Sequence, residues 1–454
     1  MGAPVTIDRD RLAALRAVEE DLFIKRHPRS AELAAQARTS LLAGVPMPWM
    51  TRWPGAFPVF FDSANGARFT DVDGNEFVDL CLGDTGSMTG HALPPVADAI
   101  INRARTGITT MLPSPDAAWV GEELARRFGV PRWQLAMTAT DANRFALRFA
   151  RYLTGRPRIA VMDWCYHGTV DETLAILDPE TGAVVPRPGA LGPQVDVALT
   201  TRVVPFNDLD ALEATLAHGD VACLLMEPAL TNIGIVLPDP GYLEGVREIT
   251  RRHGVLLIND ETHTICAGPG GATKAWGLEP DMVVIGKPIG GGIPVAAYGM
   301  TAEVADRLEG PMLGHDIDVA GVGGTLTGNA LALAATRATL ANALRDEDFA
   351  IAIPLAARFT EGVQSVIDAH GLPWHVQRLG CRAEYWFCPP PSTGSQAAAA
   401  IDEELDAFMH LWTFNRGVLL APFHNMSLFC GYHTQADVDA HTAAFAGAVE
   451  ALLG

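Results

Sequence analysis

Short apolar runs alternate with amphipathic segments over residues 118–300. Three of the apolar runs are VACLLME (221–227), VLLIND (255–260) and DMVVIG (281–286), each too short to favour a helix. Between such runs, residues 141–155 (DANRFALRFARYLTG) place apolar side chains three and four positions apart, which predicts an amphipathic helix. Buried strands that alternate with amphipathic helices are typical of a mostly parallel sheet covered on both faces. The pattern therefore predicts an α/β fold.

The two ends of the chain show a different pattern. Residues 1–75 begin as a helix and become rich in Pro and Trp, and residues 57–81 suggest two short strands around the turn Asp73-Gly74. From about residue 326 the chain is helical and then mixes short strands with helices. We expect a large domain over 76–335 and a smaller α+β domain over 336–454, which residues 1–75 join.

Composition and charge exclude several classes of protein. The 454 residues are 48% hydrophobic and carry a formal net charge of −20, which argues against binding to nucleic acid or to an anionic membrane surface. No apolar run reaches the roughly 18 residues that a membrane-spanning helix needs. The seven cysteines form no CxxC pair, so we expect reduced thiols, no metal site and a cytoplasmic location.

Charged residues follow directly after two of the predicted buried strands. The stretch LLINDETHT (256–264) places Asp260 and Glu261 at the end of one strand, and IGKPIGGGIP (285–294) places Lys287 at the end of another. A buried carboxylate is costly without a partner, and ligands of doubly wound sheets bind at the carboxyl ends of strands. A lysine in a glycine-rich run is more commonly a surface residue, but the apolar strand before Lys287 argues against that interpretation here.

Three further strand ends carry polar or aromatic residues. Thr138, Ala139 and Thr140 open a helix and could bind phosphate or simply cap the helix. Tyr166 and His167 lie in the run Trp164–Gly168, where an aromatic ring could stack on a ligand or only pack, and Glu227 ends a third strand. Together the five strand ends meet the needs of pyridoxal 5′-phosphate, which takes a lysine, an acid at its ring nitrogen, an aromatic face and a phosphate site.

The chain resembles the class III (ω-) aminotransferases of pyridoxal phosphate fold type I over roughly residues 35–450. The acid pair followed by GKPIGGG, within the block 224–294, carries the resemblance. It implies that Lys287 is the lysine that binds the cofactor covalently and moves the proton, and that Asp260 faces the pyridinium nitrogen. By the same resemblance, Tyr166 stacks on the ring with His167 beside it, and Glu227 lies near the cofactor. Relatives usually carry Ser-Gly-Thr/Ser-Glu-Ala where this chain has Thr138–Ala142.

The resemblance also implies a partner and a substrate pocket. Thr325 is similar to a threonine that reaches the phosphate from the neighbouring subunit, which implies a homodimer with a shared active site. Two stretches where one branch of the family carries carboxylate-binding arginines read PMPWMTRWPG and APFHNMSLF here. They suggest an aromatic, apolar pocket or merely packing, with these candidate residues: Trp49, Met50, Arg52, Phe423 and His424.

The sequence therefore predicts a transaminase that resembles the aminomutase-like enzymes acting on aromatic β-amino acids and amines. We expect it to move an amino group from an aromatic or hydrophobic β-amino acid or amine to a 2-oxo acid or ketone. One alternative is an aminomutase similar to glutamate-1-semialdehyde 2,1-aminomutase, which moves the amine within one molecule. A racemase, a decarboxylase and a non-catalytic pyridoxal phosphate-binding protein are more distant alternatives.

Overall fold

A computed structural model describes residues 6–192, 195–313 and 321–454. The chain forms two compact units, and each is described by itself. The large unit contains residues 94–346 and 391–399, and the small unit contains residues 1–93, 347–390 and 400–454. The division expected from the sequence, at residues 75 and 335, stays a prediction, because compactness alone does not define a folding domain.

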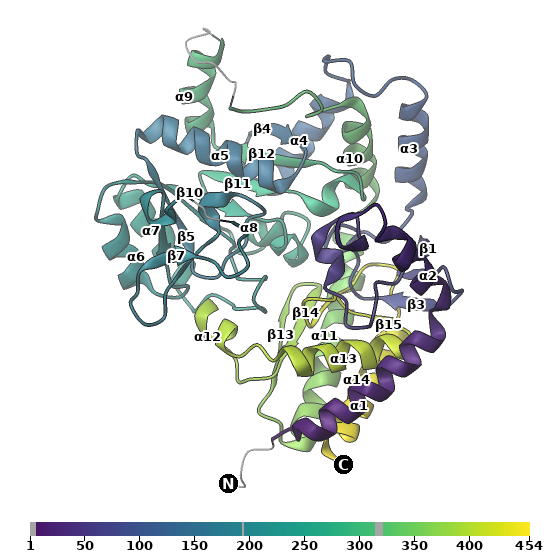
Figure 1. Ribbon diagram of the computed structural model, residues 1–454. Coiled ribbons are helices and arrows are strands. Elements are labelled where there is room, and N and C mark those ends of the chain that lie inside the picture. Colours follow the sequence, from purple (N-terminus) through teal and green to yellow (C-terminus); the bar gives the residue numbers. More distant parts are fainter. Residues whose placement is uncertain (1–5, 193–194, 314–320) are drawn as a thin grey trace. The chain divides into compact units, whose positions relative to one another are not determined.

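A seven-stranded sheet forms the centre of the large unit (Figure 1). Its strands, in spatial order, are β4 (Arg132–Ala136), β12 (Ala296–Met300), β11 (Met282–Ile285), β10 (Leu256–Asp260), β9 (Val221–Met226), β5 (Arg158–Met162) and β8 (Thr201–Val204). Strand β12 is antiparallel to both its neighbours, and β11, β10, β9, β5 and β8 pair in parallel. The mostly parallel mixed sheet predicted from the sequence is confirmed.

Helices flank this sheet, and a short hairpin, β6 (Ala175–Leu177) with β7 (Val184–Pro186), accompanies it. The helix predicted over 141–155 is α5, which contacts β4, β9, β10, β11 and β12. The other helices are α3 (Pro94–Ala104), α4 (Asp116–Phe128), α6 (Leu209–Leu216), α7 (Tyr242–Arg252), α8 (Gly271–Ala275), α9 (Ala302–Leu313), α10 (Ala330–Asn342) and α12 (Gly394–Ala399).

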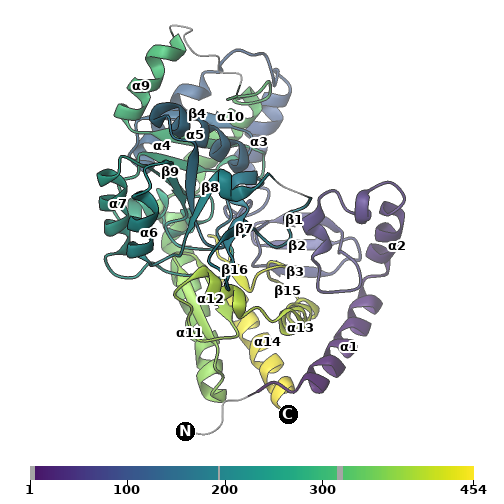
Figure 2. The same cartoon turned by 60° about the vertical axis from the view of Figure 1, so that its left-hand side comes forward.

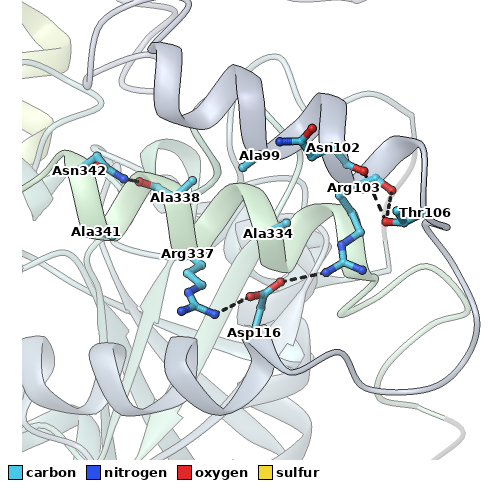
Figure 3. Close-up of a pocket in the computed structure, with 10 residues that line it drawn as sticks. All are labelled: Ala99, Asn102, Arg103, Thr106, Asp116, Ala334, Arg337, Ala338, Ala341 and Asn342. Atoms are coloured by element: carbon cyan, nitrogen blue, oxygen red, sulfur yellow. Dashed lines mark hydrogen bonds and ion pairs between the residues drawn. The ribbon is translucent and has the colours of Figure 1, made fainter.

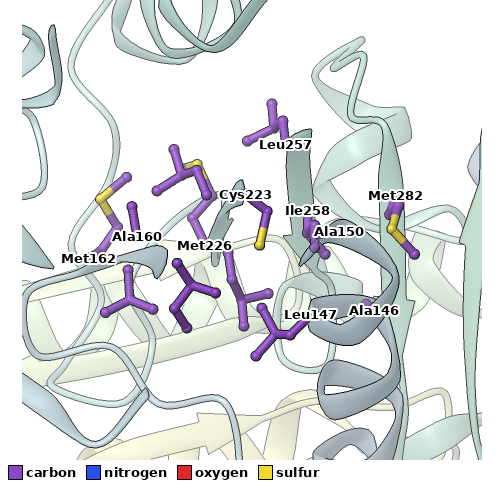
Figure 4. Packing of buried hydrophobic residues seen from close by; sticks show 14 of the residues in the cluster. Ala146, Leu147, Ala150, Ala160, Met162, Cys223, Met226, Leu257, Ile258 and Met282 are labelled. Carbon is purple, nitrogen blue, oxygen red and sulfur yellow. The ribbon is translucent and has the colours of Figure 1, made fainter. Parts of the chain in front are cut away.

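The core of the large unit forms where α5 (Ala139–Thr154) meets the central strands (Figure 4). Ala146 and Ala150 are completely buried and belong to one cluster with Met226 and Ile258. Small side chains on this face of the helix let it approach the sheet closely, and the strands β9 and β11 are buried along their whole length. This packing holds the first turn of α5 near the strand ends.

The small unit is built from both ends of the chain. Its helices are α1 (Arg9–Arg26), α2 (Pro28–Ala37), α11 (Asp346–His370), α13 (Glu403–Asn415) and α14 (Gln435–Leu453). One sheet has the order β1 (Phe61–Asn65), β2 (Arg68–Asp71), β3 (Glu76–Asp79) and β15 (Val418–Leu419). A second has the order β13 (His375–Leu379), β14 (Arg382–Trp386) and β16 (Met426–Leu428).

Two contacts join the N-terminal and C-terminal segments of the small unit (Figures 1 and 2). Strand β15 pairs with β3 in parallel, and α1 packs against α13. The two strands predicted around the turn Asp73-Gly74 are confirmed as β2 and β3, and a third strand, β1, precedes them because Gly66, at φ 56°, makes a second turn. No helix among the described residues combines the length and the apolar character needed to cross a membrane.

Candidate active site

The direction of the strands brings the five predicted strand ends to one edge of the large sheet. Strands β5, β9, β10 and β11 are parallel, and β4 has the same direction because β12 lies antiparallel between β4 and β11. The carboxyl ends of all five strands therefore lie at the same edge. The residues predicted from separate parts of the sequence are the ones that follow these ends.

Asp260 ends β10 and is almost completely buried, with 3% of its surface exposed. Its Oδ2 accepts hydrogen bonds from His167 Nδ1 and Asn143 Nδ2, both at 2.8 Å. Its Oδ1 accepts a hydrogen bond from the backbone N–H of Thr262 at 3.1 Å. His167, expected beside Tyr166, is thus also a partner of Asp260, and Asn143 from α5 is a second one.

These contacts decide the charge of the Asp260 side chain. Burial alone would raise the pKa of Asp260, but the hydrogen bond and positive charge of His167 outweigh it and lower the pKa to about 2. Burial would lower the pKa of His167, but Cys165 and Asp260 raise it above its ordinary value. His167 therefore favours the ionised form of Asp260, which places a carboxylate at the end of the central strand.

The neighbouring Glu261 has a different environment. Its carboxylate accepts hydrogen bonds from Thr264 Oγ1 at 2.6 Å and from the backbone N–H of Ala272 at 2.9 Å, at the start of α8. A Cβ on Gly271 would come within 2.2 Å of Glu261 Oε2, so only glycine leaves room for this carboxylate. Glu261 therefore caps a short helix, a structural role that differs from that of Asp260.

Lys287 follows β11, and its Nζ lies 2.7 Å from Nε2 of His263. The backbone of Lys287 has a φ of 47°, a conformation that residues other than glycine seldom adopt. His263 is buried, with 5% of its surface exposed, and it lies three residues after Asp260. His263 lies inside the stretch LLINDETHT but was not among the residues predicted for the site.

The predicted phosphate site is the first turn of α5. Thr138 is the N-cap residue, and its Oγ1 accepts from the backbone N–H of Asp141 at 3.2 Å and donates to the Asp141 carboxylate at 2.9 Å. The Thr140 hydroxyl accepts from the backbone N–H of Thr169 at 3.1 Å. A helix start with backbone N–H groups remains suited to an anion, but the Thr138 hydroxyl also has the capping role that the sequence allowed.

Two glycines let the backbone approach this turn. A Cβ on Gly168 would lie 2.0 Å from Thr140 Oγ1, and a Cβ on Gly286 would lie 2.9 Å from Cβ of Ala139. The strand ends of β5 and β11 therefore meet the start of α5 so closely that no side chain fits between them. Such a backbone cradle, with a lysine amine and an ionised carboxylate at the same sheet edge, fits the phosphate, aldehyde and ring nitrogen of pyridoxal phosphate.

A second group of residues lies around Tyr166. Glu227 is buried and accepts hydrogen bonds from Thr231 and, at 3.3 Å, from Asn232. Burial raises the pKa of Glu227 above its ordinary value, and the charge on His167 offsets only part of this increase. Arg187, which the sequence analysis missed, follows the β6–β7 hairpin and places its guanidinium 6.0 Å from the centre of the Tyr166 ring. The aromatic side chain is therefore bordered by a cation.

Thr325 belongs to the large unit, and the predicted substrate-pocket residues belong to the small unit. Thr325 is exposed in the turn before α10, and the structure contains one chain, so its role toward a second subunit stays a prediction. In the small unit, the rings of Trp49 and Phe423 lie 5.1 Å apart, and Arg52 lies 5.9 Å from the centre of the Trp49 ring. His424 contacts Phe423, and Met50 is half exposed.

A pocket with a volume of about 450 Å³ opens elsewhere in the large unit, between α3 and α10 (Figure 3). Alanines line it, and Asp116 forms ion pairs with Arg337 at 2.8 Å and Arg103 at 3.5 Å at one side. None of the residues predicted for the active site lines this pocket. Among the described residues, no group of three His, Cys, Asp or Glu side chains could hold a metal ion.

Comparisons with known proteins agree with this arrangement. The model of the family "Aminotransferase class-III" matches residues 49–381. A glutamate-1-semialdehyde 2,1-aminomutase from Desulfitobacterium hafniense is 34% identical over 420 residues, which cover 90% of this chain and 95% of that protein.

Solved structures give the same result. A glutamate-1-semialdehyde aminomutase from Pseudomonas aeruginosa PAO1 is 48% identical in sequence, and its structure gives a TM-score of 0.96 over 99% of this chain and all of that chain. A variant of that protein was solved in complex with PMP. An ω-transaminase from Sphaerobacter thermophilus is 27% identical, with a TM-score of 0.85 over 95% of this chain and all of that chain. With the family model spanning most of its length, the chain belongs to the class-III aminotransferases, enzymes of pyridoxal phosphate fold type I.

Proposed function

We propose that this enzyme is a 2,1-aminomutase that moves an amino group between neighbouring carbons of one substrate, as the name of its relatives describes. This was the alternative in the sequence analysis, and the comparisons favour it over the β-amino acid transaminase that we preferred there. The similarity to the Pseudomonas aeruginosa aminomutase, at 48% identity over 99% of the chain, carries the proposal. Glutamate-1-semialdehyde is the substrate to test first.

The residues at the sheet edge have separate roles in this proposal. Bound pyridoxal phosphate joins covalently to an amine and withdraws electrons from the carbon that carries it. Asp260, ionised because its pKa is about 2, holds a proton on the ring nitrogen. Lys287 binds the cofactor between turnovers and then carries the proton to and from the substrate carbon. The first turn of α5, from Thr138 to Thr140, binds the phosphate, and Tyr166 covers one face of the ring.

A second candidate function is the transaminase predicted from the sequence, with an aromatic or hydrophobic β-amino acid or amine as donor. The cluster of Trp49, Phe423 and Arg52 favours it, because aromatic rings beside a guanidinium suit an aromatic carboxylate. The similarity to the ω-transaminase from Sphaerobacter thermophilus also supports it. In both functions we propose a homodimer in which Thr325 of one subunit approaches the phosphate of the other.

The deciding experiment compares one substrate with two. The purified enzyme, loaded with pyridoxal phosphate, is given glutamate-1-semialdehyde alone, and the isomer with the amine on the terminal carbon is measured by mass spectrometry and NMR. A parallel sample receives a racemic aromatic β-amino acid with a 2-oxo acid. Isomer formation without an added acceptor is the expected result, and turnover only in the parallel sample would establish the transaminase instead.

The Lys287→Ala variant is the matched control for both samples. Loss of the proton-transferring amine is expected to lower turnover by at least about 10²- to 10⁴-fold. Isomer formation that persists in this variant would mean that another group carries the reaction, and the proposed role of Lys287 would be wrong.

A further inference from the structure

His263 and Lys287 meet because of the register between two neighbouring strands. Asp260 of β10 lies opposite Val284 of β11, and the two strands are parallel. His263 follows Asp260 by three residues, and Lys287 follows Val284 by three residues. Two residues that each follow a paired position by the same number of residues lie near each other beyond the ends of parallel strands. Here the side chains of His263 and Lys287 are in contact.

The contact between them is short and joins two basic nitrogens. Lys287 Nζ and His263 Nε2 are 2.7 Å apart, the length of a charge-assisted hydrogen bond. In a hydrogen bond of this length one nitrogen donates a proton and the other accepts it, and Nε2 of an imidazole can take either role. The imidazole is buried, with 5% of its surface exposed, so the surrounding residues keep it beside the lysine amine.

This geometry has a chemical consequence for the lysine amine. An ammonium group cannot attack an aldehyde or accept a proton from carbon, so Lys287 must lose a proton before either step. A proton can pass directly from Nζ to Nε2, breaking one N–H bond and forming another, and the same hydrogen bond returns it afterwards. No other reactant is needed for this transfer.

We propose that His263 is a second catalytic residue, which accepts the proton of Lys287 whenever that amine acts as nucleophile or base. The inference rests on the proposed role of Lys287 and is independent of whether the enzyme is an aminomutase or a transaminase, because the lysine binds the cofactor before any substrate is present. It concerns the rate at which the amine reacts and not the affinity of the site for the cofactor.

The test measures covalent attachment of pyridoxal phosphate to the cofactor-free protein, without substrate. Attachment is followed in a stopped-flow spectrometer as the growth of visible absorbance. The His263→Gln variant keeps a side chain of similar size that can accept a hydrogen bond from Lys287 but cannot carry a proton. We expect attachment to slow by about 10- to 100-fold in this variant, with little change in the amount of cofactor finally bound.

A second variant separates proton transfer from positioning. In His263→Ala, free imidazole added to the buffer is expected to restore much of the attachment rate, whereas it should leave the wild-type rate unchanged. Wild-type attachment rates in His263→Gln would overturn the proposal, and so would an absence of acceleration by imidazole in a folded His263→Ala protein. If the alanine variant does not fold, the glutamine variant alone decides.

The composition of the chain makes the attachment site easy to verify. There are three lysines, Lys25, Lys274 and Lys287, and the first two are exposed. Borohydride reduction followed by peptide mass spectrometry is expected to locate the cofactor on Lys287 in wild type and in both variants. Cofactor on another residue in wild type would overturn the role of Lys287 and this inference with it, whereas a failure to convert glutamate-1-semialdehyde would leave both untouched and count only against the aminomutase.

Discussion

The pKa values of two buried carboxyl groups, Asp260 in the large unit and Glu384 in the small unit, are shifted in opposite directions. Both expose 3% or less of their surface. Three hydrogen bonds of 2.8–3.1 Å hold Asp260, and its pKa falls to about 2. Glu384, on β14, has Arg382 at 3.4 Å and His424 at 3.7 Å, and burial raises its pKa to about 7 despite the arginine.

The difference shows that a nearby charge does not by itself keep a buried carboxyl group ionised. Asp260 receives short, directed hydrogen bonds from a cation, an amide and the backbone, which together exceed the cost of burial. The Glu384 contacts are longer, and the charges of Asp406 and Asp84 add to the effect of burial. The donors around Asp260 therefore keep this carboxylate ionised, whereas the surroundings of Glu384 favour the neutral acid.

The largest effect is expected from removing the charge at the sheet edge. Asp260→Asn keeps the shape but loses the charge that holds a proton on the cofactor ring, so kcat should fall by about 10²- to 10⁴-fold. The matched control is Asp406→Asn in the small unit, where burial raises the pKa of the carboxyl group to about 7. Turnover of the control should stay within about threefold of wild type. Equal losses of turnover in both variants would mean that the charge of Asp260 has no special role in the reaction.

A second test removes the cation beside Asp260. His167→Leu leaves a buried carboxylate without its charged partner, which is expected to lower the free energy of unfolding of the cofactor-free protein by about 3–5 kcal/mol in urea. The control is His441→Leu in the small unit, where burial lowers the pKa of the histidine to about 3 and the ring is neutral. A loss below about 1.5 kcal/mol is expected there, as for a volume-conserving change in a core. Similar losses in both variants would contradict the ion pair.

The dependence of stability on pH should have opposite signs in the two regions. Glu384 binds its proton more tightly when folded, so its contribution is complete below its ordinary pKa of 4.5 and is lost as the pH rises toward 7. Asp260 contributes stability above its ordinary pKa of 3.8, and this contribution is lost as the pH falls toward 2.

The Glu384→Gln variant isolates the first of these effects. The loss of unfolding free energy between pH 4.5 and 7.5 should shrink by about 3 kcal/mol, because one pKa unit corresponds to about 1.4 kcal/mol. Urea titrations at several pH values measure this slope. An unchanged slope would show that Glu384 is ionised in the folded protein, as Asp260 is.

The smallest effect is expected at Asp116, a carboxylate near the surface of the large unit. Its ion pairs with Arg103 and Arg337 border the α3–α10 pocket, and the two arginine side chains are 29% and 48% exposed. Asp116→Asn should lower the unfolding free energy by about 0.2–1 kcal/mol, and added salt should reduce the difference. A loss as large as that of His167→Leu would mean that the difference in burial between Asp116 and Asp260 does not decide how much each carboxylate contributes to stability.

Much of the candidate site could be predicted from strand ends alone, because each apolar run is followed by polar or charged residues and these strand ends lie at one edge of the sheet. Asp260 and Lys287 were found in this way, and so was the start of α5. The role of His263 was missed because its contact with Lys287 depends on the pairing of Asp260 with Val284, which no periodicity reveals. Arg187 was missed for a similar reason, since a hairpin returns it to Tyr166.

The sequence by itself determined the alternation of strands and helices, the choice of cofactor and the lysine expected to bind it. These follow from local order, because a buried strand, a turn and a helix start are each written in a few consecutive residues. Only the tertiary structure decided the charge of each acid. The adjacent residues Asp260 and Glu261 have different partners. Asp260 accepts hydrogen bonds from His167 and Asn143, which come from distant parts of the chain, whereas Glu261 caps α8. A carboxyl group in a protein interior is ionised or neutral according to the donors that the fold brings within about 3 Å of it.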